Sequence, residues 1–226
     1  MSPVKLNQGT KSEEVTIMYI AIEGVIGVGK TTLARLLQPV FQSDLLLEVF
    51  EENPFLSSFY SDRERYAFQT QIFFLLSRYH QQRRATTQLP LHNSLISDYT
   101  FEKDALFARI NLQGDELEMY YRVHQALAEK ILTPDLVVYL RADTDILMQR
   151  IALRDRPYER QMEKDYIHTL NQAYETFFAD PPANLKVLTI DTNLLNFVTS
   201  NENLKWVENR IRQALQLSPF QESLPL

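Results

Sequence analysis

Short apolar runs recur along the chain, and longer stretches of mixed apolar and polar residues separate them. Within each run the apolar residues are nearly continuous rather than alternating, which is typical of strands in a parallel sheet covered on both faces. The pattern predicts strands at Ile17–Glu23, Leu45–Phe50, Ser94–Ser97, Leu136–Leu140 and Lys186–Ile190.

The stretches between these runs place apolar residues three and four positions apart, as one face of a helix does. The predicted helices are Lys30–Phe41, Arg63–Arg84, Asp115–Leu132, Thr144–Leu153, Glu163–Phe178 and Asn201–Leu217. This alternation of strands and helices predicts an α/β fold, with a five-stranded parallel sheet and helices on both faces. No linker-like stretch divides the chain, so we expect residues 17–217 to form a single domain.

The two ends of the chain differ from this pattern. Residues 1–16 are polar and lack the apolar core of a signal peptide, and residues 218–226 contain two prolines. We expect a flexible N-terminal extension and a loose C-terminal tail. No apolar run is long enough to span a bilayer, so we predict a cytoplasmic protein with no membrane partner.

Composition and charge narrow the classes of partner. Apolar residues make up 45% of the chain and charged residues 23%, as in an ordinary soluble globular protein. The net charge of −6 gives no overall attraction for nucleic acid or anionic membrane, so any polyanion must meet a local cluster of Lys and Arg. The chain has no cysteine, which excludes disulfides, thiolate catalysis and Cys-ligated metal.

A glycine-rich segment directly after the first predicted strand carries the strongest motif. Gly24–Thr31 matches G-x-x-x-x-G-K-[ST], with a strand before it and a helix opening at Lys30. Backbone N–H groups of such a loop bind phosphate oxygens, the lysine reaches the β- and γ-phosphates, and the threonine hydroxyl binds Mg²⁺. The predicted ATP-binding residues are Gly24, Val25, Ile26, Gly27, Val28, Gly29, Lys30, Thr31 and Thr32.

A phosphate loop also occurs in GTPases and motor ATPases, but the chain has no N-K-x-D-like segment for guanine and no added motor domains. An arginine cluster instead favours a kinase. Arg150, Arg154 and Arg156 lie near a predicted helix end, and we expect them to form a lid at about 150–163 that stabilises charge during transfer. The competing interpretation is a solvated helix end paired with nearby acidic residues.

Two acidic residues lie at the ends of predicted strands, whose carboxyl ends face the ligand site in parallel sheets. Glu48 lies within the second apolar run, where a charge serves no solubility purpose, and is the candidate base for an acceptor hydroxyl. Asp98 follows the third strand and is a candidate, with Thr31, for holding Mg²⁺.

These motifs, in this order, resemble those of the deoxyribonucleoside kinase family, in particular the bacterial deoxyadenosine/deoxyguanosine kinases. The resemblance runs from about Tyr19 to Thr192. It implies that Glu48 activates the sugar 5′-hydroxyl and that Tyr60 bonds the 3′-hydroxyl, although a surface tyrosine would look alike. It also implies that Gln71 and Arg78 read the base edge; their spacing of seven puts both on one helix face.

The resemblance further identifies Arg150, Arg154 and Arg156 as lid arginines and Glu159 as a lid acid that holds the 3′-hydroxyl. Tyr99 stands where animal members carry an arginine, so one cation that would organise the acidic pair is missing. The Asp98-Tyr99 form is similar to that of purine-preferring bacterial members.

Several aromatic positions have two interpretations. Phe68, Phe74 and Phe101 could sandwich a base or belong to the core. His124 lies in an apolar helical stripe, where a structural histidine is the expected role rather than a ligand.

The sequence thus predicts an ATP- and Mg²⁺-dependent deoxynucleoside 5′-kinase of nucleotide salvage. Its expected partners are ATP and a deoxynucleoside, deoxyadenosine or deoxyguanosine, with no nucleic acid. By resemblance we expect a homodimer. The alternatives are a nucleoside monophosphate kinase of thymidylate-kinase type and a non-catalytic nucleotide-binding regulatory module.

Overall fold

The computed structural model describes residues 18–88 and 94–218. The extension expected at 1–16 and the tail from residue 219 onward lie outside the described residues, as does Ile17 of the first predicted strand. No helix in the described part is long and apolar enough to cross a membrane.

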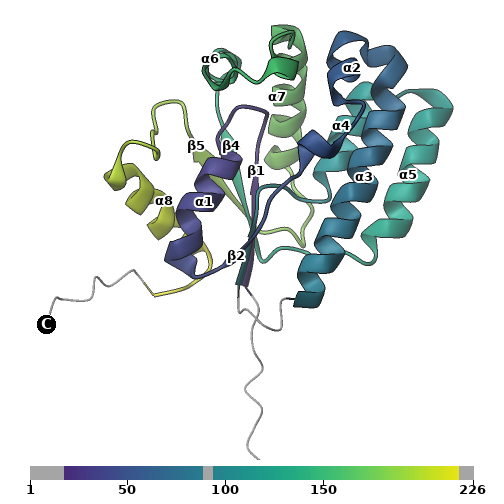
Figure 1. Cartoon of the computed structure of the whole chain (residues 1–226). Coiled ribbons are helices and arrows are strands. Elements are labelled where there is room, and N and C mark those ends of the chain that lie inside the picture. Colours follow the sequence, from purple (N-terminus) through teal and green to yellow (C-terminus); the bar gives the residue numbers. More distant parts are fainter. Residues whose placement is uncertain (1–17, 89–93, 219–226) are drawn as a thin grey trace, which may run out of the picture.

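Within the described residues, five strands form one parallel sheet at the centre of the molecule (Figure 1). They are β1 (Met18–Glu23), β2 (Asp44–Leu46), β3 (Ser94–Ser97), β4 (Leu136–Arg141) and β5 (Val187–Asp191). The order across the sheet is β2-β3-β1-β4-β5, and each neighbouring pair runs parallel. In register, Ala21 of the central strand pairs with Ser97 and Val137. The predicted parallel sheet is confirmed.

Helices cover both faces of the sheet. They are α1 (Lys30–Phe41), α2 (Leu56–Ser61), α3 (Arg63–Gln88), α4 (Lys103–Asn111), α5 (Gly114–Ala128), α6 (Thr144–Arg154), α7 (Lys164–Ala179) and α8 (Asn201–Ala214), with 3₁₀ segments η1 (Phe50–Glu52) and η3 (Pro157–Glu159). Figure 1 shows α1 and α8 on one side of the strands and α3 and α5 on the other.

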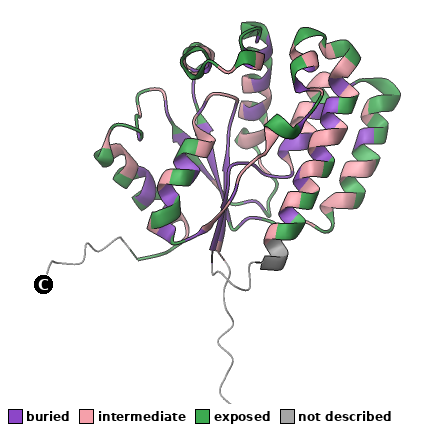
Figure 2. Ribbon diagram, in the orientation of Figure 1, coloured by how far each residue is buried: buried purple, intermediate pink, exposed green. Residues whose placement is uncertain are grey.

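The three central strands, β3, β1 and β4, are buried on both faces, as the purple ribbons at the centre of Figure 2 show. Successive side chains of a strand point to opposite faces. In β1, Ile20 packs in the cluster that contains Leu33 of α1, whereas Tyr19 belongs to a second cluster against which Phe177 of α7 packs. Two-sided burial explains the continuous apolar runs in the sequence.

The second predicted strand, Leu45–Phe50, is wrong in its extent, because β2 comprises only Asp44–Leu46. The backbone N–H of Asp98 donates to Leu46 O at 3.3 Å, and the N–H of Glu48 then bonds to the side chain of Asp98 rather than to a strand. Glu48 therefore lies in the loop after β2.

Two helices are missing from the sequence prediction. The first, α2, is short and includes serines of modest helix propensity. In α4 the charged residues Lys103 and Asp104 are buried, which interrupts the expected apolar periodicity. The predicted helices Asp115–Leu132 and Asn201–Leu217 end earlier, at Ala128 and Ala214.

Candidate active site

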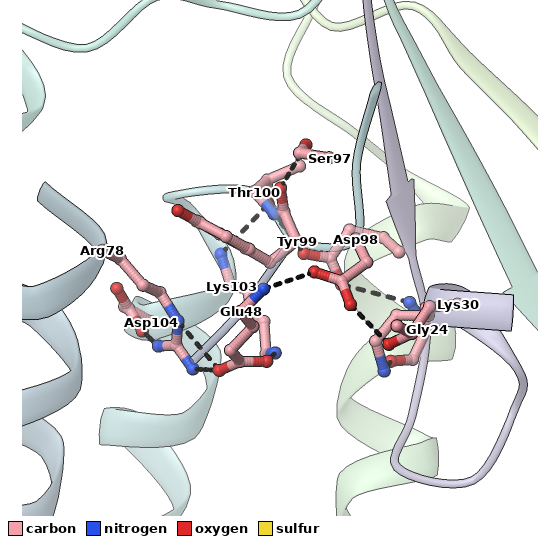
Figure 3. Close-up of polar contacts among 12 residues, drawn as sticks. Gly24, Lys30, Glu48, Arg78, Ser97, Asp98, Tyr99, Thr100, Lys103 and Asp104 are labelled. Carbon is pink, nitrogen blue, oxygen red and sulfur yellow. Dashed lines mark hydrogen bonds and ion pairs between the residues drawn. The ribbon is translucent and has the colours of Figure 1, made fainter. Parts of the chain in front are cut away.

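Three loops that follow neighbouring strands meet at one edge of the sheet (Figure 3). β1 leads into residues 24–29, β2 leads toward Glu48, and β3 leads into Asp98. Because β3 lies between β2 and β1, these carboxyl ends are adjacent. The acidic residues singled out in the sequence are thus brought to the edge where parallel sheets bind ligands.

The loop at 24–29 turns sharply between β1 and α1. Gly24 has a φ of 144°, and a Cβ there would lie 2.3 Å from the carbonyl oxygen of Leu140, so only glycine fits. The Nζ of Lys30, the first residue of α1, donates to the carbonyl oxygens of Gly24 (2.7 Å) and Val25 (3.2 Å). An ammonium group and a helix N-terminus therefore lie at one loop, an arrangement that binds phosphate.

The two predicted metal ligands, Thr31 and Asp98, are in direct contact. Thr31 Oγ1 donates to Asp98 Oδ2, and the backbone N–H of Glu48 donates to Oδ1 at 2.8 Å. One hydroxyl and one carboxylate suit a Mg²⁺ ion that arrives with a nucleotide and keeps waters and phosphate oxygens as its other ligands. Among the described residues, no group of three or more His, Cys, Asp or Glu could hold an ion alone.

The carboxylate of Glu48 lies between two cations (Figure 3). Arg78 donates to Oε1 through Nε (3.1 Å) and Nη2, and Lys103 Nζ donates to Oε2 at 2.8 Å. Burial alone would raise the pKa of this carboxyl, but the charges of Arg78 and Lys103 outweigh burial and hold the pKa well below its usual range. Glu48 is therefore ionised at neutral pH.

Arg78 is shared between two acids. Besides Glu48 it pairs with Asp104, whose side chain is fully buried, and its guanidinium lies 4.7 Å from the ring centroid of Phe74. Gln71 lies two turns earlier on α3, and both side chains line one cavity. The shared helix face is confirmed, whereas the base-reading role of Gln71 and Arg78 stays a prediction.

We name this space the acceptor cavity. It brings together twelve of the predicted site residues: Ile26, Gly27, Lys30, Thr31, Glu48, Tyr60, Gln71, Arg78, Asp98, Arg154, Arg156 and Glu159. Phe74 also lines it. Phe101 instead stacks on His124 at 4.7 Å, and burial lowers the pKa of that histidine, in keeping with a structural role.

Four residues of the predicted lid segment line this cavity: Arg154, Arg156, Tyr158 and Glu159. The buried carboxylate of Glu159 holds the arginines together. Glu159 is 5% exposed and accepts three hydrogen bonds from Arg154, at 2.6 to 3.1 Å. Nη1 of Arg156 lies 3.7 Å from Oε1 of the same carboxylate. Arg156 also lies 4.1 Å from the ring centroid of Phe50, and Tyr158 stacks on Tyr60 at 6.4 Å. Arg154 and Arg156 therefore line the acceptor cavity and are not merely part of a solvated helix end.

Arg150 is placed differently from the other two arginines. It donates to Thr192 Oγ1 (3.0 Å) and O (2.6 Å), and to the Val28 carbonyl at 3.4 Å. It lines a second cavity beside the glycine loop, which also contains Phe197 and the exposed Leu194. Arg154 and Gly27 line both cavities, so the two spaces meet at the loop.

Comparison with known proteins decides the family. A family model described as deoxynucleoside kinase matches residues 20–216, from β1 to beyond α8. The chain belongs to the deoxynucleoside kinase family. It is therefore a phosphotransferase that uses ATP, and its fold is that of a P-loop NTPase.

Other deoxynucleoside kinases are similar over most of this chain. The deoxyguanosine kinase of Bacillus subtilis (strain 168) is 33% identical over 88% of this chain and 99% of its own. The deoxyadenosine kinase of Dictyostelium discoideum is 33% identical over 84% of this chain and 78% of its own. The M. mycoides deoxyadenosine kinase, solved with dCMP and dCDP as products, is 25% identical with a TM-score of 0.76, covering 87% of this chain and 100% of that one.

Sequence reasoning missed several residues in and beside this kinase's site. Lys103 and Asp104 contact Glu48 and Arg78, and Tyr158 lines the acceptor cavity. Glu23, 1% exposed, accepts bonds from Thr100 N (2.6 Å) and from the hydroxyl of a tyrosine on α7. The only sequence signal for Lys103 and Asp104 was that they are a charged pair shortly after Asp98. Such a pair looks like the ordinary polar start of a helix.

We expect kcat/KM for ATP in this kinase to fall as the pH rises through about 8. Burial, with the positive charge of Lys103 beside it, lowers the pKa of Lys30 to about 8, so the free enzyme loses this phosphate-binding charge above that pH. Bound triphosphate raises the same pKa, so kcat should hold to higher pH. Burial raises the pKa of Tyr158 to about 12, so that phenol does not titrate near pH 8. A kcat/KM that is flat well above pH 8 would contradict this assignment.

Proposed function

We propose that this kinase transfers the γ-phosphoryl group of ATP to the 5′-hydroxyl of a purine deoxynucleoside, deoxyguanosine or deoxyadenosine. The observation that carries the proposal is the ionised Glu48 carboxylate in a cavity that continues to Lys30 of the phosphate loop. A carboxylate there can accept the proton of a neutral hydroxyl. The names of relatives, deoxyguanosine and deoxyadenosine kinases, support the purine preference.

In the proposed reaction the hydroxyl oxygen forms a bond to the γ-phosphorus while the bond to the bridging oxygen of ADP breaks. The hydroxyl proton passes to Glu48. Three cations stabilise the charge on the moving phosphoryl group: Lys30, Arg154 and Arg156. All three line the acceptor cavity, and Arg154 also lines the second cavity. Catalysis of this kind depends on positioning and electrostatics rather than on a covalent intermediate.

We assign the acceptor's sugar and base to opposite ends of the acceptor cavity. Tyr60 and Glu159, both near Tyr158, would bond the 3′-hydroxyl, because the lid brings this acid over the cavity. Gln71 would make two hydrogen bonds with a base edge, since an amide offers both a donor and an acceptor. Arg78 would share that edge through Nη1, which would leave Asp104, while Nε and Nη2 stay bonded to Glu48.

We assign ATP to the phosphate loop, Gly24–Thr32, and to the second cavity. There Phe197 and the exposed Leu153 and Leu194 offer apolar surface to a base, and Arg150 fixes the segment after β5 through Thr192. Thr31 and Asp98 would hold Mg²⁺ with the triphosphate. When bound, the ion would neutralise phosphate charge.

We also propose the domain organisation and the oligomeric state that the sequence predicts. Residues 17–217 act as one domain whose segment 150–163 is a lid. Leu76 of α3 and Met119 of α5 are 41% and 50% exposed, which supports a homodimer formed through these helices. Nucleotide salvage and a cytoplasmic location stay predictions.

A monophosphate acceptor fits this cavity less well. Its phosphate would need unpaired cations, but Arg78 and Lys103 are paired with Glu48, and Arg154 is paired with Glu159. A bound phosphate would also lie near two carboxylates, Glu48 and Asp98, and like charges repel.

One assay separates the three candidate functions. ADP release would be measured with the whole chain, ATP and Mg²⁺ against deoxynucleosides, ribonucleosides and nucleoside 5′-monophosphates. We expect release that depends on deoxyguanosine or deoxyadenosine. Release that depends on a monophosphate would favour the nucleotide kinase, and the absence of any acceptor-dependent release would favour the non-catalytic regulatory module.

A further inference from the structure

Lys103 is a buried cation in an unfavourable place. Its side chain is 5% exposed, and it is the first residue of α4, where the helix dipole disfavours positive charge. Burying an ammonium group also costs solvation. The position is stabilised by the bond from Nζ to Glu48 Oε2 at 2.8 Å, and the Phe107 ring centroid lies 5.5 Å away. The lysine is therefore oriented toward the reacting carboxylate.

The two oxygens of Glu48 are not equivalent. Oε1 accepts two bonds, from Nε and Nη2 of Arg78, whereas Oε2 accepts one, from Lys103. Each carboxylate oxygen has about two acceptor sites. Oε1 is thus filled and Oε2 retains one site, so a substrate hydroxyl meets the oxygen that Lys103 holds.

Tyr99 stands where animal members of the family carry an arginine, and it supplies no positive charge to Glu48. The Tyr99 hydroxyl donates to Gln81 at 3.0 Å, and the ring lies 5.8 Å from the guanidinium carbon of Arg78. Figure 3 shows Lys103, rather than Tyr99, directed at Glu48. The second cation on this carboxylate therefore comes from the start of α4.

We propose that Lys103 is a positioning residue for phosphoryl transfer, which fixes Oε2 of Glu48 so that its remaining acceptor site faces the 5′-hydroxyl. The inference rests on the proposed role of Glu48. It assigns Lys103 no contact with the moving phosphoryl group, and its effect on rate passes through Glu48 alone.

Lys103→Met tests this role. We expect kcat to fall about 10²-fold, the cost of a misplaced catalytic group, while KM for ATP and deoxynucleoside changes little. Lys103→Arg should recover part of kcat, because a guanidinium can donate to the same oxygen. An unchanged kcat in Lys103→Met, or no recovery in Lys103→Arg when both proteins are folded, would overturn the proposal.

A double-mutant cycle with Glu48→Gln shows whether the two residues act as a unit. If Lys103 acts through Glu48, Glu48→Gln/Lys103→Met is expected to be no slower than Glu48→Gln alone. Effects that multiply would overturn the proposal and indicate independent action of Lys103. Normal turnover in Glu48→Gln would instead remove Glu48 as the base, so failure of the underlying function gives a different result.

Two controls accompany the cycle. Lys130→Met changes an exposed lysine just after α5 and should leave kcat unchanged. Thermal unfolding and ATP binding of each variant check that the site is folded. If Lys103→Met loses ATP binding as well as turnover, while Lys103→Arg binds ATP but remains as slow, the positioning role is wrong.

Discussion

Replacing Glu48 with glutamine is expected to lower kcat by about 10²- to 10⁴-fold, the usual contribution of a general base. The amide keeps the size of the side chain but cannot take the proton of the 5′-hydroxyl. ATP binding should persist, because Glu48 contacts Arg78, Lys103 and Asp98 rather than the phosphate loop. Steady-state kinetics and direct measurement of ATP affinity would check both statements.

Glu52→Gln is the matched control for this change. Glu52 lies in η1, a few residues beyond Glu48, and is exposed. The same loss of charge there should leave kcat at the wild-type value. Turnover of Glu48→Gln close to that of this control would remove Glu48 from the reaction.

Replacing Arg154 with methionine is expected to lower kcat by about 10³-fold or more, as loss of a catalytic arginine does in phosphoryl transfer. Arg154 lines both cavities and is bidentate to Glu159, so its loss removes charge at the transfer point and leaves a buried acid with fewer partners. Arg154→Lys should recover little, because one ammonium cannot reproduce the two-pronged geometry.

Arg160→Gln is the control for the lid. This arginine pairs with Asp155, and both side chains are 62% exposed, so the pair lies outside the acceptor cavity. We expect unchanged turnover, since exposed pairs contribute little. If Arg154→Met resembles Arg160→Gln in rate, the lid arginine has no catalytic role.

The central strands of the sheet were predictable because they are buried on both faces. Continuous apolar runs such as Leu136–Leu140 leave few alternatives to a parallel strand. The end of β2 was not predictable, because it depends on the side chain of Asp98, fifty positions away, capturing the backbone of Glu48. Such long-range contacts leave no local signal in the sequence.

The residues of the site also fall into a group that the sequence could predict and a group that it could not. The phosphate loop and its lysine follow from a local motif, Glu48 and Asp98 follow from their places at predicted strand ends, and Gln71 follows from the family resemblance. Lys103 and Asp104 could not be recognised, because charged residues at a helix start are usually solvated. Only their burial against Glu48 and Arg78 distinguishes them.

The most direct test of the central claim is to follow the labelled γ-phosphate of ATP into product with deoxyguanosine or deoxyadenosine. The account predicts label on the 5′-oxygen of the nucleoside, and no product from a 5′-deoxy analogue. Label on the 3′-oxygen, or no labelled nucleotide with either purine deoxynucleoside, would contradict it.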